Sequence, residues 1–571
     1  MLQPRSLSEI DLTPVSGKTY LNIEREWREE FIYFLMVDRF HDATPRQPVL
    51  SANRTTGITT PDNQFYGGKI RGITENLDYI AGLGCTAIWM SPVFGNNDGA
   101  YHGYNINNYL DIDPHFGSKQ DLIDLVEAAH NYQKNGKPFP IRIILDVVIN
   151  HSGDNWFYPG NVPYNYINDQ RFDFGGWRDT EKPFPTELRN PDFYHRKGNM
   201  SDYDNPPQNQ NGDMSGLKDY ANDDDQTGSE VINALIKIHA YWIKETDVDG
   251  FRVDAIKHMG ALACSRFSSN IREFALSLGK RDFFLFGELA VPNDDIIDRY
   301  VGPNTSRLDD QTVFFGIDSV LDFPLAEGKY NDPNHRPLRD VLKGFAGPET
   351  LFNRLNAQRY RALNRGELGR YLVTFVDNHD SFWQPAGRIG AGPTPDAQIV
   401  GAIGYLICAM GTPCIYYGTE QGFEGQGNDN NMREAMFDKN NSGNNLLNTD
   451  CTIYRQIAQI AQVMRETAHL RFGRMYYRQI SGDGEHFGYP FGTTYTLAFS
   501  RLLWGSEVLV AYNVSSQARS DHVIVDASFH AIGSKMSFLY GAADSVTVKQ
   551  APSGARYVKL DLAPYQFVVL Q

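Results

Sequence analysis

The stretch IRIILDVVINH (residues 141–151) sets the pattern for the rest of the chain. It is an apolar, β-branched run of strand length, with one acid, Asp146, inside it and Asn150 and His151 at its end. Such a run predicts a buried strand. Seven other runs are likewise short and mainly apolar. The eight predicted strands are Phe31–Val37, Ala87–Met90, Ile141–Ile149, Gly250–Val253, Phe283–Phe286, Val313–Ile317, Leu372–Val376 and Cys414–Tyr417.

Helical patterns separate these runs, as at Leu122–Tyr132, Val231–Lys244 and Ala397–Met410. Strands that alternate with helices form βαβ units and a parallel sheet. Eight units over about 400 residues predict an α/β fold in which the sheet closes into a (β/α)8 TIM barrel. An open doubly wound sheet is the alternative. It is weakened because no glycine fingerprint for a dinucleotide follows the first strand.

The alternation of strand and helix patterns is absent from three parts of the chain. Residues 1–28 precede the first strand without a clear assignment, and residues 152–227, after the third strand, are rich in Asn, Asp, Pro and Tyr with little periodicity. A long loop at that end of a barrel is more often functional than a linker. From residue 474 to 571, short strands and turns predict a separate antiparallel β domain. The barrel would then comprise residues 29–151 and 228–473.

Composition excludes several classes of protein. The chain of 571 residues is 41% hydrophobic and 21% charged, which fits a soluble globular protein and not a disordered one. A net charge of −16 argues against a nucleic-acid partner. The five cysteines, at positions 85, 264, 408, 414 and 451, lack CxxC spacing, so neither a disulfide framework nor a zinc site is expected.

No membrane partner is expected either. The longest charge-free stretch, Ile399–Gly418, is long enough to span a bilayer, but Gly411-Thr412-Pro413 interrupts it, so we predict a buried helix, a turn and a buried strand. The N-terminus has no apolar segment of a secretory signal, and a cytoplasmic location is the simpler expectation. A mature secreted chain would begin in the same way, so both locations stay open.

Charged side chains stand at the ends of several predicted strands. Because alternate residues of a strand share a face, Arg252 and Asp254 lie on one side of Gly250–Val253. A cation beside Asp254 is expected to lower its pKa and keep it ionised, as a nucleophile requires. A purely structural Arg–Asp pair is the alternative. Asp146 needs a partner inside its apolar strand, and Arg252 on the adjacent strand is the candidate.

Two further strand ends carry acids. Glu288 follows the apolar run FLFG (284–287), a surround that suits a general acid, although a Glu at a helix start is the alternative. Asp377-Asn378-His379-Asp380 follows Leu372–Val376. Carboxylates that converge on one rim of a barrel, without a serine elbow or a dense histidine cluster, indicate glycosidic-bond chemistry. Aromatic residues make up 13% of the chain and offer faces on which sugar rings stack.

Four ordered segments carry a resemblance to a known family. DVVINH (146–151), GFRVDAIKH (250–258), FGELA (286–290) and FVDNHD (375–380) resemble the conserved regions of the α-amylase family of retaining glycoside hydrolases, glycoside hydrolase family 13. Residues 65–94 and 100–118 also look like that family's second and third βα units. The resemblance implies a catalytic (β/α)8 domain A, an inserted domain B after strand 3 and a C-terminal β-sandwich domain C.

The resemblance also implies roles for single residues. Asp254 matches the nucleophile, Glu288 the general acid/base, and Asp380 the third carboxylate, which binds the sugar at the reacting subsite. Arg252 matches the residue that holds the nucleophile. Tyr104 resembles the aromatic platform beneath the sugar ring, and the remaining sugar-binding candidates are His102, His151, His379, Lys257 and His258.

Lys257 and His258 favour α-1,4-glucans or maltooligosaccharides, because in the family this pair is typical of amylases and related transglycosylases. The leading hypothesis is therefore retaining hydrolysis of α-1,4-glucosidic bonds. A transglycosylase that forms new α-linkages or cyclic products is the second hypothesis. An inactive carbohydrate-binding subunit is the third, and it predicts the loss of a carboxylate, whereas all three are present.

The resemblance leaves a structural calcium ion open and implies no organic cofactor. Many family members bind calcium through an Asn that matches Asn150 and an Asp near the end of domain B. In MSGLKD (214–219) the Asp position is Gly216, so Asp219 would have to replace it. Calcium takes six to eight oxygen ligands, and Asn222–Asp225 would supply others.

Overall fold

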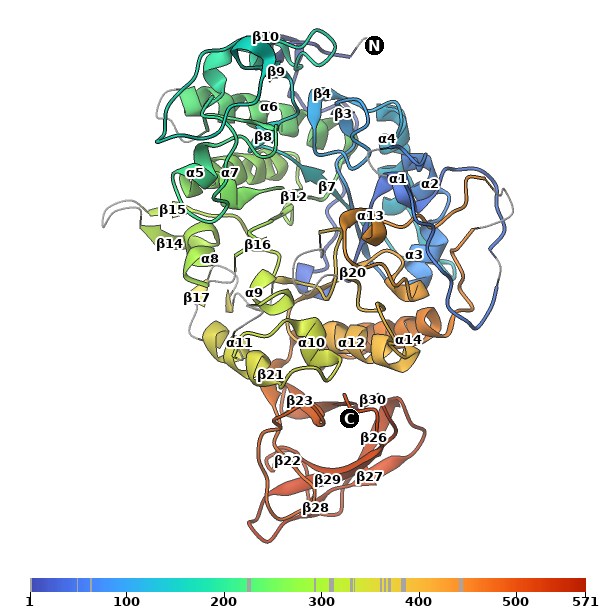
Figure 1. Cartoon of the computed structure of the whole chain (residues 1–571). Helices are drawn as coiled ribbons and strands as arrows, with labels where there is room; N and C mark the ends of the chain where they lie inside the picture. Colours follow the sequence, from blue (N-terminus) through green and yellow to red (C-terminus); the bar gives the residue numbers. More distant parts are fainter. Residues whose placement is uncertain are drawn as a thin grey trace.

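A computed structural model gives the structure of the chain (Figure 1). It describes residues 3–48, 50–61, 64–222, 227–291, 294–307, 313–328, 332, 334–359, 362–363, 366–367, 371–380, 387–440 and 445–571. In Figure 1 a central barrel carries a long inserted segment at one end, and an all-β unit lies beyond α12 and α14. No helix among these residues has the length and apolarity that a membrane span needs.

Eight strands form one sheet in the order β16-β13-β12-β7-β2-β1-β20-β19. Neighbouring strands pair in parallel, and a bridge between Leu321, just after β16, and Val373 on β19 closes the ring. The structure therefore confirms the (β/α)8 barrel. The strands are β1 (Ile32–Leu35), β2 (Ala87–Met90), β7 (Arg142–Val147), β12 (Gly250–Val253), β13 (Phe284–Gly287), β16 (Ser319–Val320), β19 (Val373–Thr374) and β20 (Thr412–Tyr416).

One predicted strand is wrong. Residues Val313–Phe315 form β15, which pairs antiparallel with β14 (Pro303–Arg307), while the sixth barrel strand is the two-residue β16. Ser319 pairs with Phe286 of β13. An apolar run predicts a strand but not its partner, and the short β16 has too few apolar residues to stand out in the sequence.

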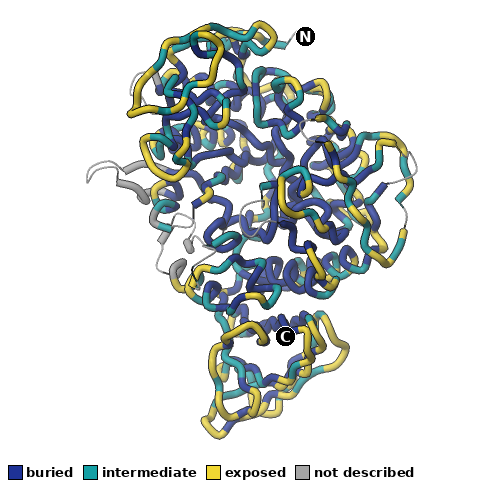
Figure 2. The backbone as a smooth tube through the Cα atoms, viewed as in Figure 1, coloured by how far each residue is buried: buried dark blue, intermediate teal, exposed yellow. Residues whose placement is uncertain are grey.

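Helices cover the barrel strands. The predicted helices correspond to α4 (Lys119–His130), α6 (Thr227–Thr246) and α12 (Asp396–Cys408). The buried helix α12 and the following strand β20 confirm the prediction for residues 399–418. A Cβ on Gly401 would lie 2.2 Å from the Tyr512 ring, so this glycine lets α12 approach the C-terminal domain closely. Buried residues fill the barrel, and exposed residues gather on loops (Figure 2).

The segment between β7 and α6 holds short elements around an aromatic cluster. Strand β8 (His151–Ser152) pairs antiparallel with β11 (Lys218–Asp219). This pairing joins the start of the segment to a strand near its end. Trp156 packs edge-on against Tyr158 and Tyr194 at 4.7 and 5.8 Å between ring centroids. Aromatic packing orders this polar segment, because such pairs bury large apolar surfaces. The exact domain limits stay a prediction.

Two antiparallel sheets form the C-terminal β-sandwich. One has the order β21-β23-β24-β30-β26-β27 and the other β22-β25-β29-β28. Leu509 and Val568 of the first sheet share one buried cluster with Val523 and Val558 of the second. The main strands are β23 (Thr496–Leu503), β24 (Ser506–Asn513), β25 (Arg519–Ile524), β29 (Arg556–Leu562) and β30 (Phe567–Leu570).

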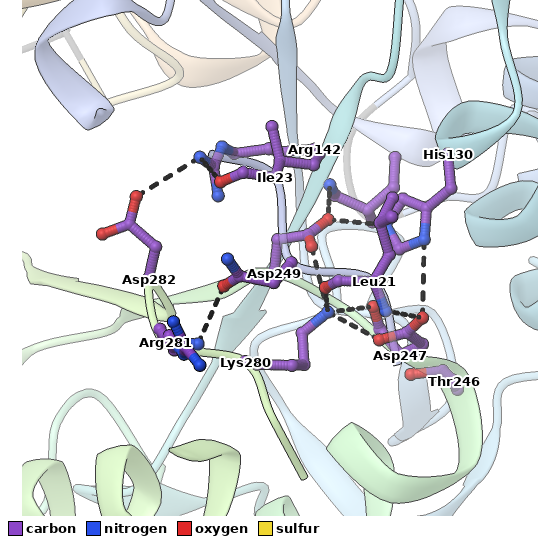
Figure 3. A network of polar contacts seen from close by, with 12 residues as sticks. Leu21, Ile23, His130, Arg142, Thr246, Asp247, Asp249, Lys280, Arg281 and Asp282 are labelled. Atoms are coloured by element: carbon purple, nitrogen blue, oxygen red, sulfur yellow. Dashed lines mark hydrogen bonds and ion pairs between the residues drawn. The ribbon is translucent and has the colours of Figure 1, made fainter. Parts of the chain in front are cut away.

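The floor of the barrel is closed by the N-terminal residues and a buried polar network (Figure 3). Lys280 Nζ donates to Leu21 O, to Asp247 Oδ1 and to Asp249 Oδ1 at 2.9, 2.6 and 3.1 Å. His130 Nε2 lies 2.9 Å from Asp249 Oδ2. Two cations and two carboxylates thus compensate one another where water is excluded.

This network predicts a loss of stability at alkaline pH. Burial alone would lower the pKa of His130, but Asp249 and Asp247 outweigh it and raise the pKa from 6.5 to about 9. The contribution of His130 is complete below pH 6.5 and is lost as the pH rises toward 9. We expect the free energy of unfolding, measured with urea, to fall by about 3 kcal/mol across this interval. His130→Asn should flatten this dependence; an unchanged slope in the variant would contradict the prediction.

Candidate active site

Arg252 joins three carboxylates at the carboxyl ends of adjacent barrel strands. Its Nη1 lies 2.8 Å from Asp146 Oδ1 and 2.6 Å from Asp254 Oδ1, and its Nη2 lies 3.0 Å from Glu288 Oε2. The Arg252–Asp254 contact confirms the pair that strand alternation predicts, and the Arg252–Asp146 contact confirms Arg252 as the predicted partner of Asp146. The guanidinium side chain is only 1% exposed, so its charge is screened little by water.

Asp146 is held from three sides. Besides Arg252, the indole Nε1 of Trp89 donates to its Oδ2 at 3.1 Å, and the Tyr104 hydroxyl donates to the same oxygen at 2.9 Å. Trp89 and Asp146 belong to the neighbouring strands β2 and β7. Asp146 therefore anchors Arg252 and Tyr104 and is itself only 1% exposed.

The pKa of Asp254 shifts in the direction opposite to the one predicted, because the group is buried and several carboxylates lie close to it. The sequence predicts that Arg252 lowers the pKa of Asp254, but burial and the nearby Glu288 and Asp146 charges raise it well above its ordinary value. Burial likewise raises the pKa of Asp146 to about 6 against the effect of Arg252. One guanidinium shared by three acids favours a bound proton within the group.

Glu288 follows β13 and is held by the chain that leaves β12. The Ala255 N–H donates to Glu288 Oε2 at 3.0 Å, and the Ile256 N–H donates to the Glu288 carbonyl at 3.1 Å. The backbone turns at Ala255, whose φ is 50°. Glu288 is 17% exposed at its side chain and Asp254 is 10% exposed, so both can reach a ligand.

Asp380 faces a second cation that the sequence analysis missed. Arg433 Nη2 lies 2.8 Å from Asp380 Oδ1, and its Nη1 donates to the Tyr101 hydroxyl at 3.1 Å. Arg433 follows β20 in a polar stretch, and no pattern there distinguishes it from a solvated arginine. The Asp380 side chain is 28% exposed and so remains accessible.

Tyr104 and two histidines form a stacked group. The Tyr104 ring lies 5.7 Å from His102 and 5.5 Å from His379, both nearly parallel to it. The Tyr104 hydroxyl lies 2.9 Å from His379 Nε2. Burial lowers the pKa of His102 to about 3 and that of His151 to about 4, so both are neutral hydrogen-bonding groups at physiological pH.

Lys257 and His258 are engaged by the inserted segment. Lys257 Nζ lies 2.6 Å from Asp204 Oδ1. His258 Nδ1 lies 2.7 Å from the Asn209 carbonyl. These two predicted sugar-binding residues lie on η6 (Ile256–His258), directly after the turn at Ala255.

Asn150 and Asp219, the predicted metal ligands, are in contact. Asn150 Nδ2 donates to Asp219 Oδ1 at 3.2 Å, while His195 Nδ1 lies 2.6 Å from Asp219 Oδ2. Asn150 Oδ1 and Asn222 Oδ1 are buried and have no hydrogen-bond partner among the described residues. These oxygens fit the donors that calcium prefers. Among the described residues no group of three or more His, Cys, Asp or Glu side chains could hold a metal ion, and Asp223–Asp225 lie outside them.

Comparisons with known proteins agree with this geometry. An alpha-amylase of Streptomyces lividans is 28% identical over 563 residues, covering 86% of this chain and 57% of that protein. A cyclomaltodextrin glucanotransferase of Klebsiella oxytoca is 28% identical over 435 residues, covering 71% of this chain and 59% of that protein. The chain thus spans less than two thirds of the length of these two relatives.

A solved structure and a family model extend the likeness. The crystal structure of an alpha-amylase from Geobacillus thermoleovorans in complex with acarbose matches with a TM-score of 0.68 and 26% identity, covering 96% of this chain and 99% of that chain. The model of the alpha amylase catalytic domain matches residues 34–459. With its closed barrel and its acidic rim, the chain therefore belongs to the alpha-amylase family of glycoside hydrolases.

Proposed function

We propose that the chain hydrolyses α-1,4-glucosidic bonds in starch-like glucans or maltooligosaccharides with retention of configuration. The observation that carries the proposal is the pair Asp254 and Glu288, both bound to one guanidinium, accessible, and at the ends of adjacent barrel strands. A retaining glycosidase needs one carboxylate as nucleophile and a second carboxyl group as acid and then base. The names of the relatives support an α-glucan as the substrate.

The first step would form a covalent intermediate. Asp254 attacks the anomeric carbon as the bond to the leaving oxygen breaks, and Glu288 gives its proton to that oxygen. Arg252 fixes the attacking carboxylate at 2.6 Å.

The second step would release the sugar. Glu288, now ionised, removes a proton from water, and the water oxygen bonds to the anomeric carbon as the bond to Asp254 breaks. Two inversions at one carbon retain the α configuration. Asp380, His379 and His102 would bind hydroxyls of the reacting sugar, His151 would contribute from β8, and Tyr104 would lie against the ring.

Product analysis tests this proposal. The protein is incubated with starch, maltotriose, pullulan and cyclodextrin in parallel, and the anomeric form of each product is followed by NMR. The expected result is shorter oligosaccharides released first as α anomers. Release of β anomers would contradict retention, and no cleavage of any substrate would contradict the function.

Transglycosylation is the second candidate. The likeness to a cyclomaltodextrin glucanotransferase favours it specifically. Water and a sugar hydroxyl would compete for the same intermediate, so products longer than the substrate, or cyclic products, would identify transfer. The third hypothesis, an inactive binding subunit, is opposed by the convergence of Asp254 and Glu288 on Arg252.

We also propose Asn150 and Asp219 as ligands of a structural calcium ion, which would tie the end of β7 to β11 of the inserted segment. A ligand at about 100 times its Kd stabilises a fold by about 2.7 kcal/mol. We therefore expect a chelator to lower the melting temperature, calcium to restore it, and Asp219→Asn to remove the difference. Identical melts of the wild type with chelator and with calcium would refute this site.

A further inference from the structure

Arg354 binds two acids that come from different loops of the barrel. It lies on α11 (Glu349–Arg359), and its Nη2 is 2.7 Å from Oδ1 of Asp322, two residues after β16. Its Nη1 donates to Oδ1 of Asp294, the first residue of α8 (Asp294–Tyr300), which lies on the same side of the barrel (Figure 1). The Arg354 side chain is 9% exposed, so water screens its charge little. We call Asp294, Asp322 and Arg354 the arginine clamp.

The arginine clamp holds the far end of the loop that carries Glu288. Asp294 follows Glu288 by six positions, along the chain that leaves β13. The near end of this loop is bound to β12 and to the chain after it. The Glu288 N–H donates to the Val253 carbonyl at 2.8 Å, and the Ala255 N–H donates to Glu288 Oε2 at 3.0 Å. The loop is therefore fixed at both ends, by these bonds at Glu288 and by the Arg354 side chain at Asp294.

Asp322 anchors the arginine clamp on the barrel itself. Its N–H donates to the Val373 carbonyl of β19 at 2.9 Å, and the N–H of the preceding Leu321 donates to the Gly287 carbonyl of β13 at 3.0 Å. The Asp322 carboxylate also accepts the Leu325 N–H at 3.2 Å. Asp322 is thus tied to the strands on both sides of β16, which gives Arg354 a partner in a fixed place.

A further contact fixes the helix that carries Arg354. Phe352 of α11 packs against Tyr477 of β21 (Arg474–Tyr477) and against Tyr489, at 4.8 and 5.2 Å between ring centroids. Both tyrosines belong to the C-terminal β domain. Arg354 therefore binds the loop from a support outside the acidic rim, and a side chain supported in this way can hold a loop within the small tolerance that catalysis requires.

We propose that Arg354 is a positioning residue for the general acid. By holding Asp294 it keeps the loop after β13 in place, so that the Glu288 carboxyl group meets the leaving oxygen in the correct orientation. The proposal rests on the proposed function and adds to it a residue that touches neither the sugar nor the reacting atoms. Its specific consequence is that loss of the arginine clamp impairs proton transfer to the leaving group more than the attack of Asp254.

Two substrates with different leaving groups separate these effects. In maltohexaose the leaving sugar oxygen needs the proton of Glu288, whereas the fluoride of α-maltosyl fluoride leaves without one, because fluoride is a much weaker base than a sugar alkoxide. For both substrates kcat/KM reports the steps up to the breaking of the bond at the anomeric carbon and excludes release of the covalent intermediate. The ratio of the two kcat/KM values therefore measures how well Glu288 is placed.

The main variant removes the carboxylate at the end of the loop. In Asp294→Ala we expect kcat/KM on maltohexaose to fall by about tenfold and kcat/KM on α-maltosyl fluoride to stay within about twofold of the wild type, because only the general acid is displaced. Arg354→Met should give the same split, and the double variant should lose little more than either single variant, since both remove one contact. Arg354→Lys keeps the charge without the planar fork and should recover part of the loss.

The variants differ in their risk to folding. Arg354→Met leaves the buried Asp322 without its cation, and breaking a buried pair is strongly destabilising. The Asp294 side chain is 20% exposed, so its removal is the milder change. Asp294→Ala decides the question if Arg354→Met does not fold.

Arg272→Met is the matched control. Arg272, on α7 (Ala261–Ser277), lies 2.7 Å from Asp318 Oδ1, and the other oxygen of that carboxylate accepts the N–H of Leu285 in β13 at 3.0 Å. This ion pair supports β13 ahead of the loop, so its removal tests a weakened strand without release of Asp294. Any loss of kcat/KM in this variant should be equal for the two substrates.

The outcomes separate the positioning role from the proposed function. A wild-type protein that cleaves maltohexaose, together with equal changes on both substrates in Asp294→Ala, overturns the positioning role and leaves the proposed function standing. A wild-type protein that cleaves no α-glucan overturns the proposed function and the positioning role with it. A loss confined to maltohexaose in Asp294→Ala, and absent from Arg272→Met, supports the positioning role.

Discussion

Asp254→Asn lowers kcat on maltooligosaccharides by at least about 10⁴-fold, the expected scale for removal of a covalent nucleophile. The amide has the shape of the carboxylate, but it carries no charge and forms no stable ester with the anomeric carbon. Initial rates of reducing-sugar release, compared with the wild type at equal protein concentration, check this result. Full activity of the variant would overturn the mechanism.

Stability measurements separate this effect from misfolding. Asp254 shares Arg252 with two other acids, so its neutralisation relieves repulsion, and we expect an unfolding free energy no lower than that of the wild type.

A second variant tests the covalent step directly. In Asp254→Gly, azide can enter from the vacated face, and an activated α-maltosyl fluoride should yield the β-azide.

Arg252→Met should cause the largest loss of stability. The substitution preserves apolar bulk but leaves Asp146, Asp254 and Glu288 without their shared cation. Breaking a buried charge pair costs about 3–5 kcal/mol, and misplacement of the nucleophile costs about 10²-fold in kcat or more. Urea unfolding and initial rates measure both effects. The stability deficit should be smaller at pH 5 than at pH 8, because protonation removes the uncompensated charge.

A double variant provides the control. Arg252→Met combined with Asp146→Asn should recover part of the lost stability, because the two side chains are in contact at 2.8 Å and their effects couple. Activity should stay low in both, since Asp254 remains unsupported. Strict additivity of the two substitutions would contradict the role of Arg252 as the shared counter-charge.

The local sequence pattern was sufficient to predict most of the barrel strands and the acidic side chains at their ends. Seven of the eight barrel strands overlap the predicted runs, because a strand buried on both faces consists of a continuous apolar stretch that can be recognised in the sequence. Because alternate residues of a strand share a face, the sequence of β12 alone puts Arg252 and Asp254 on one side. Parallel strands then bring their carboxyl ends to one rim, which explains why Asp146, Asp254 and Glu288 meet.

The missed features depend on contacts between distant segments. The strand β16 is defined by its pairing with β13 and not by its own two residues. Arg433 reaches Asp380 from the loop after β20, 53 residues along the chain, and an arginine in a polar stretch carries no mark of that contact. The shift in the pKa of Asp254 has the same origin, because it depends on how many acids share one cation.

By itself the sequence determined the family and the barrel and predicted which carboxylates gather at its rim, since periodicity and residue type are properties of short segments. Only the tertiary structure decided which charges compensate one another and how the inserted segment reaches Lys257 and His258. Those properties depend on distances between side chains far apart in the chain, and electrostatic and hydrogen-bond energies vary too steeply with distance for sequence spacing to supply them.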